Sequence, residues 1–205
     1  MKKSKNCENK IFLPRGYLSW SQMCLWKQSK EKYRQKYYFG EKERGNKYFD
    51  YGKEVAEALE GAKLSDKGFE GLKMLLPSYK HREHEIKAIL AKTPLLGKMD
   101  TFEPKTKSFR EYKTGKNGWT QNKAKKHGQL KFYALLIWLK YKKLPKEIWL
   151  DWIETKEEDG ELDYTGKIKS FKVDIKLEDL LSFMAEIKKI TLEISEDYKN
   201  KINNL

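Results

Sequence analysis

The stretch GKMDTFEPKTKSFREYKTG, residues 97–115, predicts two short strands joined by a turn at 104–108. Side chains alternate along a strand, so Glu111 and Lys113 project from the same face of the second strand. If the turn pairs the two strands, Asp100 of the first strand lies near them. Two carboxylates close together resist joint ionisation unless a cation lies between them. The stretch therefore predicts a cation site at the ends of two neighbouring strands.

The residue types in this stretch favour magnesium as the cation. Mg²⁺ binds to proteins through one or two carboxylates, with waters completing its shell. Lys113 beside it could orient or help to deprotonate a metal-bound water, and could stabilise charge on a phosphate. The predicted chemistry is hydrolysis of a phosphodiester. The alternative is a surface hairpin with an ordinary cross-strand ion pair, for which this spacing is also typical.

The charge balance of the whole chain points to an anionic partner. The 205 residues include 44 Lys and Arg against 30 Asp and Glu, which gives a net charge of +14 and a pI near 9.5. Such an excess suits a nucleic acid, although many lysines serve only to solubilise a surface. Aromatic residues make up 13% of the chain, which is too many for a disordered basic tail.

Neither a targeting segment nor a membrane span is expected. The N-terminal region has no apolar run of signal-peptide length, and the longest apolar stretch, FYALLIWL (132–139), is too short to cross a bilayer. Two cysteines, Cys7 and Cys24, are too few for a disulfide framework. We expect a soluble intracellular protein in the cytoplasm, with no membrane partner.

Hydrophobic periodicity and turn residues predict helices, then a strand meander, a crossover helix, more strands and a final helix. The expected helices are 18–40, 49–63, 69–79, 121–143 and a last one from residue 177, and the expected strands are 84–90, 94–104, 108–114, 146–155 and 167–175. Residues 157–166 have the composition of a hairpin turn. This order predicts an α/β or α+β fold, with a small mixed central β-sheet flanked by helices.

One domain is expected after a loose N-terminal leader of residues 1–16. The domain, residues 17–205, divides into a helical part (17–80), a sheet core with its crossover helix (81–175) and a C-terminal helix (176–205). The chain has no internal repeat, no low-complexity segment and no linker that would split it.

Two further features accompany the acidic pair. Gly97 precedes Asp100 by three residues, where a glycine can relieve crowding near a ligand. Gln129 and Tyr133 are four residues apart on the following helix and so share one face.

These motifs together resemble the PD-(D/E)XK nuclease superfamily and, within it, the RecB-type exonuclease branch that includes the CRISPR adaptation exonucleases. The resemblance is carried, in the family order, by GKMD (97–100), EYK (111–113) and QLKFY (129–133). Residues 18–38 also look like the opening segment of that branch, and YGKEVAEALE (51–60) looks like its first helix. The resemblance implies a restriction-endonuclease-like core behind an N-terminal helical segment.

The resemblance also implies a role for each matched residue. Asp100 and Glu111 would hold the metal, aided by the backbone carbonyl of Tyr112, and Lys113 would act on the attacking water. Gln129 and Tyr133 would face the cleft and contact substrate or position the lysine. For Tyr133 the alternative is packing in the core.

The chain departs from this pattern in two places. The branch usually has a metal-binding His four residues after the glycine of its first helix, but here Ala56 follows Gly52. Glu60 could substitute, as could the adjacent Glu57, although both suit a solvated helix surface. Glu85, on the preceding strand, is a further auxiliary acid, or else an exposed strand charge.

The second departure concerns cysteine. Many CRISPR-associated members carry four cysteines for an iron–sulfur cluster, and the two present here cannot build one. Cys24 lies near an expected cluster position, but we expect it to be a buried small hydrophobe.

Substrate contacts are expected after the second strand of the site. Lys123, Lys125 and Lys126 add positive charge just before Gln129, as suits phosphate binding. Trp119, on a glycine-flanked loop, could stack on an unpaired base or equally pin the loop to the core.

The sequence thus predicts a Mg²⁺- or Mn²⁺-dependent DNA nuclease without an iron–sulfur cluster. We expect it to be an exonuclease, or directed to single strands or ends, in DNA processing, recombination or repair. The chain has no G-x-x-x-x-G-K-[ST] phosphate loop, so a helicase or recombination protein would be a separate partner. A phage or mobile-element origin is expected by analogy. The alternatives are a catalytically inactive nucleic-acid-binding module of the same fold and a basic interaction protein.

Overall fold

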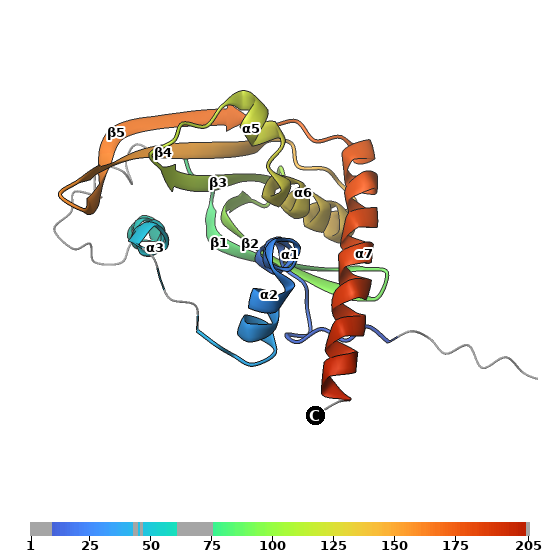
Figure 1. Cartoon of the computed structure of the whole chain (residues 1–205). Helices are drawn as coiled ribbons and strands as arrows, with labels where there is room; N and C mark the ends of the chain where they lie inside the picture. Colours follow the sequence, from blue (N-terminus) through green and yellow to red (C-terminus); the bar gives the residue numbers. More distant parts are fainter. Residues whose placement is uncertain (1–9, 43–44, 46, 61–75, 204–205) are drawn as a thin grey trace, which may run out of the picture.

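The computed structural model describes residues 10–42, 45, 47–60 and 76–203 (Figure 1). Its centre is one five-stranded sheet in the order β1-β2-β3-β4-β5. Neighbouring strands are antiparallel except β3 and β4, which are parallel, so the sheet is mixed as the sequence predicted. The strands are β1 His81–Leu90, β2 Thr93–Glu103, β3 Ser108–Gly115, β4 Ile148–Glu158 and β5 Glu161–Lys172.

Two tight turns set the register of the outer strand pairs. Ala91 and Lys92 join β1 to β2 with φ values of 45° and 70°, and Asp159 and Gly160 join β4 to β5 with φ values of 51° and 81°. Positive φ at both central residues matches the right-handed twist of the flanking strands. The hairpin expected in 157–166 is therefore confirmed, and its second strand begins earlier than predicted.

The connection from β3 to β4 crosses one face of the sheet. It contains α5 Gln121–Lys125 and α6 Gly128–Tyr141, so the single helix expected over 121–143 is broken at Lys126 and His127. The α6 helix packs against β1 and β2, and almost all of its central residues are buried. An all-round apolar helix of this kind is typical of a position inside the molecule.

The long C-terminal helix α7 Leu177–Ile202 covers α6 and also contacts α1 Trp20–Gln28 (Figure 1). The helix expected over 18–40 is in fact two helices, α1 and α2 Lys30–Tyr37, separated by Ser29. Ser29 has extended backbone and its hydroxyl accepts a hydrogen bond from the Lys32 N–H at 3.2 Å, so it caps α2.

The helix α3 Lys47–Glu60 lies apart from these helices and contacts β3 and β5 (Figure 1). A small apolar cluster beneath it contains Tyr51, Val55, Ile153 and Leu162. The main core lies between the sheet and helices α6, α7 and α1. Helix α3 packs on the smaller of these two cores and forms one wall of a pocket.

Three outcomes complete the comparison with the expected elements. Of the helix expected over 69–79, residues 69–75 lie outside the described residues, and 76–79 are not helical. Within the expected leader, Leu13 is buried in the main core and the Phe12 N–H donates to the Ser195 hydroxyl at 2.9 Å. Among the described residues, no helix combines the length and apolar character needed to cross a membrane.

Candidate active site

The site begins where β2 and β3 stop pairing. Their ladder covers three pairs only, from Glu103 with Ser108 to Thr101 with Arg110. The next residues are Asp100 and Glu111, and beyond them the strands separate. Since these two acids flank the fork, the stretch 97–115 does bring them together as expected.

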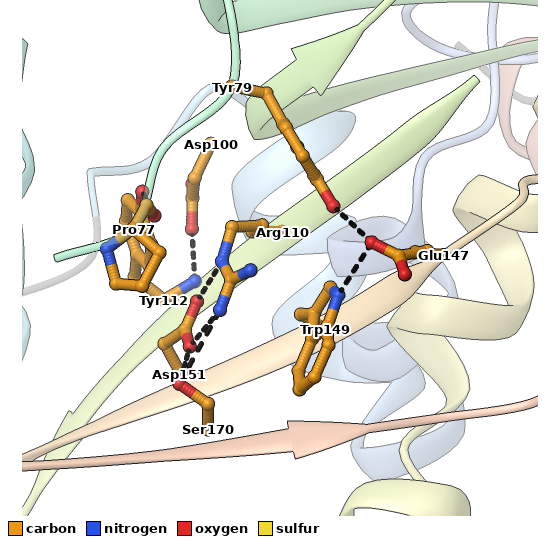
Figure 2. A network of polar contacts seen from close by, with 9 residues as sticks. All are labelled: Pro77, Tyr79, Asp100, Arg110, Tyr112, Glu147, Trp149, Asp151 and Ser170. Atoms are coloured by element: carbon orange, nitrogen blue, oxygen red, sulfur yellow. Dashed lines mark hydrogen bonds and ion pairs between the residues drawn. The ribbon is translucent and has the colours of Figure 1, made fainter. Parts of the chain in front are cut away.

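Hydrogen bonds hold the three expected catalytic side chains in place. One Asp100 carboxylate oxygen, Oδ2, accepts the Tyr112 backbone N–H at 2.5 Å (Figure 2). The Lys113 Nζ donates to Glu111 Oε1 at 2.6 Å. Glu111 is only 2% exposed, whereas Asp100 and Lys113 are partly exposed. The group is therefore a mostly buried cluster at the sheet edge of a pocket.

The protonation equilibria follow from this burial. Desolvation raises the pKa of Asp100, and the Glu111 charge raises it further, while Lys113 and the Tyr112 N–H oppose the rise. Desolvation also raises the pKa of Glu111, with Lys113 opposing it. For Lys113, burial works to lower the pKa, but the charges of Glu111 and Asp100 outweigh it and the pKa is raised. The two carboxylates therefore favour a positive charge beside them, such as that of the Lys113 ammonium group.

Glu111 provides a direct test of whether a cation suits the site. Its second oxygen, Oε2, is buried and has no hydrogen-bond partner. A buried charged oxygen without a partner is costly, and a hard cation would satisfy it. Within the described part of the chain, no group of three His, Cys, Asp or Glu side chains could hold a metal alone. A metal here would need backbone and water oxygens besides Asp100 and Glu111.

The pocket at the fork has a volume of about 430 Å³. Strand residues form its polar side and α3 forms its apolar side. It is lined by Tyr48, Gly52, Lys53, Val55, Ala56, Arg82, Glu83, Asp100, Glu111, Tyr112, Lys113 and Thr114. Ala56, the position after Gly52 at which the resemblance leads one to expect a histidine, lies in the wall of this pocket.

Of the two alternatives for Glu85, the structure favours the exposed strand charge, and Glu83 is the acid of β1 that lines the pocket. Glu85 is exposed on β1 and pairs with Lys87 at 2.9 Å. Glu83 lines the pocket, pairs with Lys98 and has a left-handed φ of 48°. Such strained conformations cluster at functional sites. Its negative charge also raises the pKa values of Asp100 and Glu111.

The hairpin register could have identified Glu83 from sequence. With Ala91 and Lys92 as a two-residue turn, Leu90 pairs with Thr93, and counting back places Glu83 opposite Asp100. The neighbouring pairs, Arg82 with Thr101 and His84 with Met99, confirm this count. The signal was the length of the turn rather than any motif.

The other proposed metal ligands of α3 are placed differently. Glu57 is exposed and lies 3.4 Å from Lys53, an ordinary helix-surface pair. Glu60 is the last residue of α3, and its side chain lies outside the described residues. Its role as a ligand stays a prediction.

Gln129 and Tyr133 support the site from α6. The Gln129 amide donates to the Tyr133 hydroxyl at 2.8 Å, and that hydroxyl donates to the Lys98 carbonyl at 2.5 Å. Tyr133 is buried, and desolvation followed by the nearby Glu111 charge raises its pKa. The nearby Gln129 side chain opposes the rise in the pKa of Glu111. Both residues thus contact the cluster from behind, and neither lines the pocket.

Gly97 has a different neighbour from the one expected. A Cβ at this position would lie 2.6 Å from Leu136 Cδ1 and 2.9 Å from the Tyr133 ring. The crowding that the glycine relieves therefore comes from α6 and not from a ligand. Its effect on the site is indirect, through the position of Tyr133.

The candidate substrate residues on the connection to α6 lie outside the pocket lining. Lys123, Lys125 and Lys126 are exposed, and their contact with phosphate stays a prediction. Trp119 packs against the main core and lies edge-on to His127, 5.1 Å between ring centres. Of its two alternatives, the structure favours the loop anchor. Cys24 is exposed, so the prediction of a buried cysteine was wrong.

The strand that carries Glu111 is secured from its other side. Arg110 donates to both carboxylate oxygens of Asp151 at 2.7 Å, and Ser170 donates to the same carboxylate (Figure 2). The Arg110 guanidinium also lies 4.9 Å from the centre of the Trp149 ring. This pair ties β3, β4 and β5 together directly behind the acidic cluster.

Comparisons with known proteins identify the fold. No protein-family model matches the chain, and no curated protein matches it either. A crystal structure from Eubacterium rectale, of a protein described as an exonuclease, is similar with a TM-score of 0.59 and 10% identity over 97% of this chain and 88% of that one. A phage-related exonuclease from Haemophilus somnus 129PT has a TM-score of 0.54 and 17% identity over 85% of this chain and 81% of that one. The chain therefore has the mixed α+β fold found in these two proteins, consistent with a restriction-endonuclease-like core.

Proposed function

We propose that this protein is a metal-dependent DNA nuclease that hydrolyses phosphodiester bonds. The observation that carries the proposal is Glu111, a buried carboxylate next to Asp100 with one oxygen paired to Lys113 and the other without a partner. In a protein interior such an arrangement is expensive unless a cation completes it. The net charge of +14 supports an anionic polymer as the substrate.

Each residue of the cluster has a role in this proposal. Asp100 and Glu111 would hold Mg²⁺ or Mn²⁺ together with the Tyr112 carbonyl. Such an ion, when bound, polarises a phosphoryl oxygen and lowers the pKa of coordinated water. Lys113 stays protonated because two carboxylates raise its pKa, so it would stabilise negative charge on the phosphate. Tyr133 would keep the cluster in position.

The likeness in fold to proteins described as exonucleases supports action at DNA ends. We include in the proposal a place in DNA processing, recombination or repair, with any helicase supplied as a separate protein. The proposal of a phage origin rests only on the second of these two proteins, which is described as phage-related.

Cleavage of end-labelled DNA tests the proposal. The wild type should degrade linear DNA in Mg²⁺ or Mn²⁺ and leave it intact in EDTA. Glu111→Gln and Lys113→Ala should each lower the rate about 100-fold or more, because each removes a charge that stabilises the transition state. Closed circular DNA, offered in parallel, would be resistant to an end-directed enzyme.

Two neighbouring residues provide matched controls. Glu85→Gln and Lys87→Ala make the same chemical changes in an exposed ion pair of β1 and should leave the rate unchanged. Metal-independent binding without any cleavage would contradict the enzyme and support an inactive nucleic-acid-binding module.

A further inference from the structure

A second polar cluster lies at the mouth of the same pocket and centres on Glu157 of β4. Its carboxylate accepts hydrogen bonds from Lys47 Nζ and Lys116 Nζ and from the Tyr48 hydroxyl, the last at 3.0 Å. The two ammonium groups lie 5.6 Å and 5.9 Å from the centre of the Tyr48 ring. Three separate segments, the start of α3, the loop after β3 and the end of β4, therefore meet around one aromatic ring.

Tyr48 is unusual because it is exposed and also lines the pocket. It is 49% exposed, yet it belongs to the same cavity as Glu111. Gly52 and Ala56 follow it at intervals of four residues and line the pocket as well. Residues at this spacing share one face of a helix. Gly52 and Ala56 therefore present small side chains to the pocket beside the tyrosine.

The size of the pocket limits what can enter. Pockets for small ligands measure about 300–1,000 Å³, and this one measures about 430 Å³. A volume of this size holds one nucleotide, so the pocket suits a single strand at the cluster around Glu111.

We propose that Tyr48, Lys47 and Lys116 form a clamp for one unpaired nucleotide of a DNA strand. The base stacks on the Tyr48 ring, and the two lysines contact the phosphates on either side of it. Glu157 occupies both lysines while no strand is present, and an incoming phosphate displaces it. This proposal deepens the proposed function and rests on the same pocket.

The chemistry of the four groups supports this assignment. An aromatic ring offers a stacking surface that accepts every base, and the nearby lysine ammonium groups attract the negatively charged backbone of the strand. The hydrogen bonds from Lys116, Lys47 and Tyr48 lower the pKa of Glu157 to about 2, so it remains a carboxylate that competes with phosphate. The contacts are exposed to water, where an ion pair is weak enough to be exchanged.

Binding measured without metal tests the clamp separately from catalysis. The full-length protein in EDTA is titrated against 5′-fluorescein oligothymidylate, and fluorescence anisotropy gives the Kd. Tyr48→Ala should raise the Kd about fivefold or more, because stacking on the ring is lost. Tyr48→Phe keeps the ring and should bind like the wild type. Phe39→Ala, which removes a similarly exposed aromatic side chain at the end of α2, should also bind like the wild type.

Two more variants examine the lysines and the pocket beside the ring. Glu157→Gln keeps the shape but removes the competing charge, so the Kd should fall roughly two- to fivefold. Ala56→Leu fills the pocket from the middle of α3 and should raise the Kd without touching Tyr48. Thermal unfolding of each variant shows whether it is folded.

The outcomes separate the two proposals. Unchanged binding by Tyr48→Ala, an equal loss in Tyr48→Phe, or weaker binding by Glu157→Gln would overturn the clamp. An equal loss on a duplex hairpin without free single strand would also overturn it. A wild type that never cleaves DNA but shows the Tyr48 dependence would contradict the nuclease and leave the clamp standing.

Discussion

In the metal-free protein, Asp100 and Glu111 lower the stability of the folded state. Both carboxylates are desolvated, the charge of Glu111 opposes ionisation of Asp100, and the charge of Glu83 opposes ionisation of both. Their pKa values are raised in the folded state, so the folded protein binds their protons more tightly than the unfolded chain does. Stability therefore falls as the pH rises from the ordinary carboxyl range through the folded-state pKa values. Functional sites often carry such a cost.

Asp100→Asn should therefore raise the melting temperature of the metal-free protein at pH 7. The asparagine oxygen can still accept the Tyr112 N–H, while the charge repulsion is removed. A gain of about 1 kcal/mol corresponds to roughly 2–4 °C in a chain of this size. The difference should shrink at pH 4, where the wild-type carboxyls gain protons, and calorimetry in EDTA measures both values.

Adding Mg²⁺ to the same two proteins supplies the complementary result. The wild type should gain stability with metal concentration, since a ligand that binds only the folded state stabilises it. Asp100→Asn should gain much less. Equal gains in the two proteins would remove Asp100 from the metal site.

At the scale of the elements, the contact of α6 with β2 depends on Gly97. In Gly97→Ala the new Cβ would meet the side chains of Leu136 and Tyr133 within 3.0 Å, so these side chains of α6 must shift. Overpacking of this kind costs about 1–3 kcal/mol. We expect a lower melting temperature together with slower DNA cleavage, because Tyr133 supports the acidic cluster.

Gly118→Ala is the matched control for this change. A Cβ at Gly118 would meet only the Trp152 ring, at an ordinary 3.6 Å. The melting temperature of this variant should stay close to that of the wild type. If both alanines lowered it equally, close packing at Gly97 would not be the cause.

The pair of Arg110 and Asp151 secures β3 from behind the site. Asp151 is fully buried and Arg110 nearly so. Asp151→Ala would leave the guanidinium charge without its partner, at a cost of about 3–5 kcal/mol. Urea unfolding should show this as a lower midpoint.

Ser170→Ala provides the comparison, because it removes one hydrogen bond to the same carboxylate and leaves the ion pair in place. A typical hydrogen bond contributes about 0.5–1.5 kcal/mol, so this midpoint should move less. A smaller loss in Asp151→Ala than in Ser170→Ala would show that the pair does not stabilise the sheet.

For the whole molecule, the net charge of +14 predicts strongly salt-dependent binding to nucleic acid. Contacts with phosphates release counterions, so the logarithm of the binding constant falls linearly with the logarithm of salt concentration, by about 0.7 for each phosphate neutralised on a single strand. Anisotropy titrations between about 50 and 200 mM salt should show a slope of at least about 1.4, from the two lysines of the clamp. A flat dependence would favour the basic interaction protein instead.

Much of the fold was predictable because its signals are local. Alternating side chains and turn residues located the strands around Asp100 and Glu111, and the spacing of these acids was enough to place them at one fork. The breaks in the helices were not predictable in this way. The break at Ser29 lies between two contacts with α7. Trp26 donates to Glu193 and Arg34 donates to Asp197, each more than 160 residues away in the chain.

The sequence by itself determined the order of the elements, the acidic pair and its lysine, since period and spacing are properties of a few neighbouring residues. The tertiary structure alone decided that the Glu83 backbone is left-handed and that this residue lines the pocket, which turn length and strand register do not show. It also decided that Tyr48 meets Glu157, 109 residues later, at the pocket mouth. Contacts between segments so distant arise from packing of the whole chain, which no local pattern encodes.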